Sequence, residues 1–419
     1  MNGSMLLQRC VLAFCLVVSA AGVRAQVDYA QVPPPNDRLE VREFENLLVK
    51  VAVPSAEETI ALFGVDLYAR NIQPVWVEVI NNSDQSRFFA PRSVDEDYYT
   101  PFETGNRLPG GVIRWLLNRD PVILERNWTR LEVKPGQTRS GYVYSRVDLG
   151  TKSFNVDVLG SDQSHLMSFF IPVPGLKLDH YQVEFQSIYP DEQVRTVTLE
   201  QLRDYLQALP CCVTDKKGKN FGDPLNIAFV GEVRDLYYTF LRAGWDETET
   251  THSAALWKML KSTLSGTEYR YSPVSSLYVF ERPQDVALQK ARTSIDERNH
   301  LRLWLTPLRF EGKPVWIGQI SRDIGIRFTK KTITTHKIDP DVDETRDFLL
   351  EDLVYAQGVE RMGYVLGVGE AAFESPRGNL TGDPYFTDGR RLVMWISDSP
   401  VALDEITIVD LGARVYAPD

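Results

Sequence analysis

Alternation of hydrophobic and polar residues with a period of two dominates the first half of the chain. In stretches such as 75–80 and 154–158, every second residue is a valine or a phenylalanine. Alternate side chains of a strand point to the same face, so each stretch predicts a strand with one buried face. Turns rich in proline and glycine, such as 134–137, separate these strands. We therefore predict an Ig-like β-sandwich domain over residues 39–189, with a short helix near 112–117.

Beyond Tyr189 the spacing of apolar residues becomes that of helices interleaved with strands. Thr198 and Gln201 form a capping-box pattern in front of leucines at helical spacing, and Pro210 ends that helix. No regular βαβ repeat is present, so residues 190–419 predict an α+β domain with a mixed sheet. The expected helices lie near 198–209, 233–241, 256–264, 288–295 and after Asp341, and the expected strands near 225–230, 277–280, 300–310, 313–328 and 392–415.

The first 25 residues have the pattern of a signal peptide. An apolar run over residues 10–23 follows Arg9, and Val23-Arg24-Ala25 supplies small residues at the positions that a cleavage site needs. The run is shorter than the roughly 20 residues of a membrane-spanning helix. We expect a mature, exported chain that begins at Gln26, followed by an extended linker over 26–38 and containing no transmembrane segment. The expected location is the periplasm or the outside of a bacterial cell.

The charge balance is acidic. The full chain has a formal net charge of −11, and loss of Arg9 and Arg24 with the signal peptide (−11 − 2) makes it −13. Nucleic acids and anionic membrane surfaces select for lysine and arginine patches, so this balance argues against both as partners.

Two of the four cysteines, Cys10 and Cys15, fall in the predicted signal peptide. The other two, Cys211 and Cys212, are adjacent. In an oxidising compartment they can close a vicinal disulfide, which would crosslink almost none of the chain. A redox-active role is the alternative, although the usual Cys-x-x-Cys spacing is absent.

Several motifs in the second half resemble the LssY C-terminal domain family over roughly residues 196–400. The resemblance implies a link to the bacterial envelope, because the family is named after a gene of a type I secretion locus and similar domains occur fused to membrane modules of the phosphatidic-acid-phosphatase type. It implies no particular activity, and this chain lacks such a membrane module. The matching segments are 222–226, 243–245, 298–304, 315–318, 321–325 and 336–343.

One of these segments contains candidate metal ligands. His336, Asp339, Asp341 and Asp343 bring an imidazole and carboxylates close together, as a divalent metal site requires. The alternative is helix capping, with Asp341 at the N-cap and Glu344 three residues later. The segment does not complete an EF-hand loop, because Glu344 stands where the loop needs glycine.

Two neighbouring strands contain the candidate ligand-binding residues. His300, Arg302 and Trp304 alternate with leucines and therefore share a strand face. A two-residue loop at Glu311-Gly312 would pair Phe310 with Lys313, so that paired residue numbers sum to 623. This register places Ser321 opposite Arg302 and Asp323 opposite His300, with a raised histidine pKa. A buried polar network is the alternative to a site for an anionic or carbohydrate-like ligand.

The leading hypothesis from the sequence is an exported binding or assembly protein of the cell envelope, whose partner is an envelope component or a small anionic ligand. The rival hypothesis is a divalent-metal-dependent hydrolase, with His336 and Asp339 as ligands and His300 or Asp323 as acid or base.

Overall fold

The computed structural model describes residues 38–108, 120–129, 131–148, 151–173, 185–247, 276–291, 298–327 and 335–413. The predicted signal peptide and the predicted helices near 112–117 and 256–264 lie outside these ranges. No helix in the described ranges is long and apolar enough to cross a membrane.

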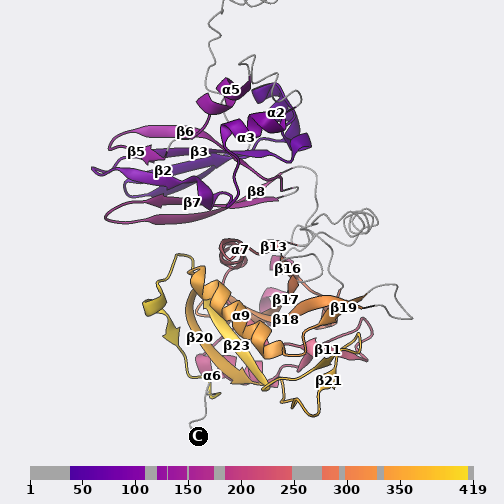
Figure 1. The fold of residues 1–419 in the computed structure, drawn as a ribbon. Coiled ribbons are helices and arrows are strands. Elements are labelled where there is room, and N and C mark those ends of the chain that lie inside the picture. The colour runs from indigo at the N-terminus through magenta and orange to yellow at the C-terminus, as the bar shows by residue number, and fades with distance from the viewer. Residues whose placement is uncertain are drawn as a thin grey trace, which may run out of the picture.

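Two four-stranded antiparallel sheets make up the N-terminal part of the structure, residues 38–173 (Figure 1). Valines of one sheet and phenylalanines and valines of the other share a single apolar core, which packs the sheets together. The Ig-like topology stays a prediction. The strands of the first sheet are, in order, β1 (Glu40–Phe44), β2 (Leu47–Ala52), β3 (Gln73–Asn81) and β6 (Thr138–Ser145), and those of the second are β5 (Glu132–Val133), β4 (Arg87–Ala90), β7 (Thr151–Leu159) and β8 (His165–Pro172).

Three short helices pack against the outer face of the first sheet. They are α2 (Ala56–Phe63), α3 (Pro101–Arg107) and α5 (Asp120–Arg126). Capping boxes fix the start of the first two, at Ser55 and Thr100. Phe63 packs edge-on against Tyr142 and belongs with Leu124 to a second apolar cluster on this sheet. The outer face is therefore covered rather than exposed to solvent.

A ten-stranded mixed sheet organises the C-terminal part, residues 185–413. Most neighbours pair antiparallel, but β12 and β23 run parallel, which confirms the predicted α+β class and mixed sheet. The strands are, in order, β13 (Asp246–Glu247), β16 (Val286–Ala291), β17 (Arg298–Phe310), β18 (Lys313–Arg327), β12 (Ile227–Val230), β23 (Arg390–Ile396), β20 (Val359–Leu366) and β24 (Thr407–Ile408), with β9 (Arg195–Val197) beside β17 and β19 (Thr335–Ile338) beside β18.

Helices cover both faces of this sheet. Leucines of α7 (Val233–Arg242) and α9 (Val342–Tyr355) pack into the core on one face, and Leu202 and Leu206 of α6 (Leu199–Ala208) pack into the core on the other. Figure 1 shows α9 lying across β20 and β23. The capping box at Thr198 and Gln201 is confirmed. Gly244, which directly follows the C-cap residue of α7, has a φ of 75°, a left-handed conformation that favours glycine.

One predicted helix is wrong. Residues 286–291 form strand β16, which pairs with β17 and β13, and residues 292–297 lie outside the description. Val286, Ala287 and Leu288 are all buried, so both faces of this strand are covered. A strand buried on both faces loses its alternation and cannot be distinguished from a helix by periodicity.

Helix α7 also connects the two parts of the structure. The Arg242 guanidinium lies 3.2 Å from an Asp157 carboxylate oxygen on β7, and Phe170 of β8 packs against Tyr237. Arg42 of β1 donates to the Tyr238 hydroxyl at 2.5 Å. One helix thus contacts both sheets of the N-terminal part.

Two smaller pairings complete the C-terminal part. A second sheet contains β11 (Phe221–Pro224), β10 (Cys212–Thr214), β14 (Tyr278–Val279) and β15 (Arg282–Pro283), and a two-stranded hairpin contains β21 (Arg377–Gly378) and β22 (Pro384–Tyr385).

Candidate functional site

The predicted polar face lies on β17 and β18 in the large sheet. His300 Nε2 is 2.6 Å from a carboxylate oxygen of Asp323, and Arg302 donates to the Gln319 side-chain oxygen at 2.9 Å. Each of these four residues is at most 7% exposed. The structure therefore brings together the imidazole, guanidinium and carboxylate that the sequence grouped on one face.

The predicted register is right at the hairpin and wrong beyond it. Phe310 pairs with Lys313 around the Glu311-Gly312 turn, as predicted. A bulge between Leu305 and Arg309 then shifts the pairing by two, so His300 lies opposite Ser321 and not Asp323. A shift of two residues leaves every side chain on its original face, and this preserves the contact between His300 and Asp323 as a diagonal one.

Trp304 lies on the same strand face but in the apolar core. Its side chain is fully buried, packs with residues such as Leu308 and Ile317, and donates its indole N–H to the Arg282 carbonyl at 3.3 Å. It therefore stabilises the sheet beside the polar residues. Ser321 is 3% exposed and directly opposes His300.

Residues distant in sequence complete the cluster. Asp223 of β11 contributes to the electrostatic surroundings of Arg302, and its carboxylate accepts a hydrogen bond from Asn379 at 2.9 Å. Asn379 belongs to the turn between β21 and β22, where its side-chain oxygen accepts from the backbone of Thr381 and Asp383. Neither residue was predicted from the sequence as a site member, although Asp223 lies within the 222–226 segment that resembles the family.

Burial dominates the protonation states of the cluster. It lowers the pKa of His300 below 6.5 despite the opposing effect of Asp323, and this corrects the predicted rise. It also raises the pKa of Asp223 and lowers the pKa of Arg302 to about 10. At neutral pH His300 is therefore a neutral imidazole, and Arg302 remains a cation between two acidic side chains.

Hydrogen bonds fix the orientation of two groups in the cluster. Asp323 lies at His300 Nε2. When this carboxylate is ionised it can only accept, which places the proton of a neutral ring on Nε2 and a lone pair on Nδ1. Arg302 donates to Gln319 Oε1, so the Gln319 amide presents its N–H groups on the other side. Within the described chain, both His300 Nδ1 and Gln319 Nε2 are buried without a hydrogen-bond partner. One free acceptor and one free donor thus remain in the same cluster.

The candidate metal ligands have other partners. Asp341 caps α9 by accepting from the backbone N–H groups of Asp343 and Glu344, which confirms its N-cap position. The Asp343 carboxylate accepts from Thr387 Oγ1 and from the Asp388 backbone, and Asp339 accepts from the Asp341 backbone. The His336 side chain lies outside the described atoms. In the ranges that the structure covers, no three His, Cys, Asp or Glu residues gather as metal ligands.

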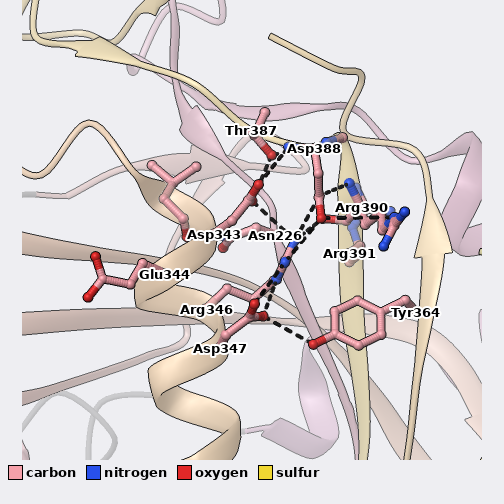
Figure 2. Close-up of polar contacts among 12 residues, drawn as sticks. Asn226, Asp343, Glu344, Arg346, Asp347, Tyr364, Thr387, Asp388, Arg390 and Arg391 are labelled. Atoms are coloured by element: carbon pink, nitrogen blue, oxygen red, sulfur yellow. Dashed lines mark hydrogen bonds and ion pairs between the residues drawn. The ribbon is translucent and has the colours of Figure 1, made fainter. Parts of the chain in front are cut away.

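A second polar cluster surrounds Arg346 on α9. Figure 2 shows its guanidinium between Asp343, Asp347 and Asp388, with Tyr364 pointing at Asp347. The guanidinium donates to these three carboxylates at 2.9–3.1 Å, and to the Arg390 carbonyl at 3.2 Å. Burial acts to raise the pKa of Asp388, but hydrogen bonds from Arg346 hold it below its usual value. Because Nε and both Nη atoms of Arg346 have partners, this cluster fastens α9 to β23 and leaves no group free for a ligand.

A cleft of about 1010 Å³ opens at the bulge of β17. Two of its charged side chains are paired with each other, since Arg309 lies 3.6 Å from Glu232, and the Tyr189 hydroxyl donates to the Leu305 carbonyl. The cleft therefore has room for a ligand, but part of its polar lining is already paired within the protein.

The comparison with known families agrees with the sequence motifs. No curated protein matches the chain. The model of one family, described as LssY C-terminus, matches residues 200–390, which include every residue of the His300 and Arg346 clusters. Residues 200–390 of this chain therefore belong to the LssY C-terminus family.

Proposed function

We propose that the C-terminal part is a binding module for a small, hydroxyl-rich ligand of the carbohydrate or polyol class, held by the His300 cluster. The observation that carries this proposal is that two of the buried atoms without a partner among the described residues, His300 Nδ1 and Gln319 Nε2, belong to the same cluster. A buried polar group without a partner costs about 1–3 kcal/mol, so such groups call for an explanation. A ligand that supplies the missing partners removes this cost.

The chemistry of the two atoms supports a hydroxyl-bearing ligand. His300 Nδ1 needs a donor and Gln319 Nε2 needs an acceptor, and a hydroxyl group is both. Two neighbouring hydroxyls on one ring satisfy the two atoms together. An anionic ligand fits less well, because Asp223 and Asp323 already balance the charge of Arg302.

A thermal-shift and calorimetry screen of the purified chain tests this proposal. The probes are glucose, N-acetylglucosamine, myo-inositol and glycerol, with inorganic phosphate as the anionic competitor. A ligand that binds only the folded state raises the melting temperature in proportion to its concentration relative to Kd. We expect at least one hydroxylated probe to stabilise the wild-type chain and to lose this effect in His300→Ala and Gln319→Leu.

Asn299→Ala is the matched control. Asn299 is the neighbour of His300 on β17, is also buried, and points to the opposite face. There its side-chain oxygen accepts from Arg322 at 3.2 Å, while its Nδ2, like His300 Nδ1, has no hydrogen-bond partner among the described residues. The control variant should keep the ligand response. An equal response in His300→Ala and in the wild type would show that the ligand binds elsewhere. Stabilisation by phosphate alone would show that the site binds an anion and not a hydroxylated ligand.

The same geometry favours one second candidate function, acid–base catalysis on a bound hydroxyl. A neutral imidazole whose protonated nitrogen is held by a carboxylate presents its other nitrogen as a general base. His300 and Asp323 have this arrangement, with Nδ1 as the free nitrogen. Turnover of a bound probe that disappears in Asp323→Asn, while binding persists, would support catalysis over binding alone.

We also propose export to the cell envelope. The support is the signal-peptide pattern of residues 1–25 and a disulfide between Cys211 and Cys212, a bond typical of oxidising compartments. Mass spectrometry of the protein recovered from the periplasm or the medium should give a chain that begins at Gln26. An intact Met1 terminus on a chain retained in the cytoplasm would contradict this proposal.

A further inference from the structure

A vicinal disulfide lies beside β11, the strand that contributes Asp223 to the His300 cluster. Cys211 and Cys212 are bonded to each other, with their Cα atoms 3.7 Å apart. Disulfides stabilise proteins mainly by closing long loops in the unfolded chain, and a bond between adjacent residues closes almost none. The bond therefore contributes little as a crosslink. Any role that it has must come from its contacts with neighbouring residues.

These contacts lead directly to the residues around Asp223. Cys212 pairs with Pro224 on β11, and the Leu225 N–H donates to the Cys211 carbonyl at 2.7 Å. Cys212 Sγ is also 3.6 Å from the Tyr385 hydroxyl of β22. The disulfide thus contacts both the strand that contains Asp223 and the hairpin that contains its partner, Asn379.

The two sulfurs differ in accessibility and in surroundings. Cys211 is half-buried, whereas Cys212 is 3% exposed. Burial raises the pKa of the Tyr385 hydroxyl, so this group stays protonated at neutral pH and can donate a hydrogen bond. Cys211 is therefore the more accessible of the two residues for an external thiol, and Cys212 Sγ lies beside a donor able to stabilise a thiolate.

We propose that Cys211–Cys212 is a redox-modification site that controls how firmly the β21–β22 hairpin closes over the His300 cluster. The thiolate of an external small thiol attacks Cys211 Sγ, the S–S bond breaks, and Cys212 leaves as a thiolate that accepts a hydrogen bond from Tyr385. A second thiolate releases Cys211 from the mixed disulfide and forms the oxidised thiol dimer, so two electrons pass from two external thiols to the protein. Once the Cys212 thiolate takes up a proton, the side chain is no longer bonded to Cys211 and can rotate away from Tyr385, which loosens the hairpin.

The effect on ligand binding rests on the proposed function, but the chemistry at the sulfurs does not. The first experiment therefore measures reduction itself. The full chain is treated with dithiothreitol, quenched with iodoacetamide, and analysed by mass spectrometry of the peptide that contains both cysteines. We expect Tyr385→Phe to be reduced about five-fold more slowly than the wild type, the effect of one lost hydrogen bond.

Tyr364→Phe is the control, because its hydroxyl donates to Asp347 at 3.1 Å and lies in the Arg346 cluster. Equal reduction rates in all three chains, or no reduction at all, would overturn the proposed attack on Cys211.

The second experiment is hydrogen–deuterium exchange on the wild-type chain before and after reduction, which needs no variant. Exchange over residues 377–386 should become at least several-fold faster in the reduced chain, and exchange over α9 should not change. Unchanged exchange over 377–386 would show that the bond does not hold the hairpin. If reduction loosens the hairpin but no hydroxylated probe stabilises the chain, the redox site is supported and the proposed hydroxylated ligand is rejected.

Discussion

His300 Nε2 lies 2.6 Å from the carboxylate of Asp323, although the two residues do not face each other across the strands. The contact is diagonal because the β17 bulge shifts the register by two residues. Burial lowers the pKa of this histidine even though a carboxylate is hydrogen-bonded to it. The central feature of the site is a neutral histidine with one ring nitrogen hydrogen-bonded to a carboxylate and the other without a hydrogen-bond partner in the described residues.

The low pKa of His300 makes stability depend on pH in a defined direction. Above about pH 6.5 the imidazole is neutral in both the folded and the unfolded chain. As the pH falls through 6.5 the unfolded chain gains a proton that the folded chain does not, so the free energy of unfolding falls, by at most about 1.4 kcal/mol per pH unit. Urea unfolding at pH 7.5 and 5.5 should show a smaller loss for His300→Gln than for the wild type.

Asp223 acts in the opposite direction, because its pKa is raised in the folded chain and protonation at lower pH stabilises the fold. The comparison between the two chains isolates His300, since both contain Asp223. Equal losses of stability in the wild type and in His300→Gln would contradict a lowered histidine pKa.

Removing Arg346 should destabilise the C-terminal part strongly. Arg346→Met leaves the carboxylates of Asp343, Asp347 and Asp388 without their shared cation, and loss of one partner of a buried ion pair costs about 3–5 kcal/mol. Chemical denaturation measures the change. The control Arg203→Met removes a surface arginine paired with Asp204 and should change the free energy of unfolding far less. Similar losses in the two variants would show that the Arg346 cluster does not fasten α9.

Gly318 is required for close packing in the large sheet. A Cβ at this position would lie 2.6 Å from a Leu303 methyl and 2.8 Å from Ile227 Cγ1, both in the core. Gly318→Ala should therefore lower the free energy of unfolding by about 1–3 kcal/mol. Gly378→Ala is the control, because no atom lies within 4 Å of its added Cβ. A Gly318→Ala chain as stable as this control would mean that the core adjusts without cost.

Local patterns in the sequence were sufficient to predict the hairpin turn and the first residues of two helices. Glu311-Gly312 adopts positive φ at both residues, as a two-residue turn requires, and Asp341 and Thr198 cap the helices that follow them. The register beyond the turn could not be predicted. The Thr306 hydroxyl bonds to the Val315 carbonyl within the bulge before Pro307, and a sequence gives no measure of how many residues a bulge absorbs.

The composition of the site was predictable only in part. Strand periodicity grouped His300, Arg302 and Asp323 correctly on one face, because a shift of two residues does not change faces. Asp223 and Asn379 are 156 residues apart in the chain and meet through tertiary packing alone. The sign of the His300 pKa shift depends on burial, which a strand pattern does not report.

NMR can measure whether His300 is neutral and which of its two ring nitrogens carries the proton. The chain contains five histidines, so ¹⁵N-histidine labelling gives few NMR signals, and His300→Gln assigns the one of interest. We predict that at pH 7 this imidazole is neutral, with the proton on Nε2 and none on Nδ1, and that a bound hydroxylated probe shifts the Nδ1 signal in the direction expected of a hydrogen-bond acceptor. An imidazolium at pH 7, or a proton on Nδ1, would contradict the account.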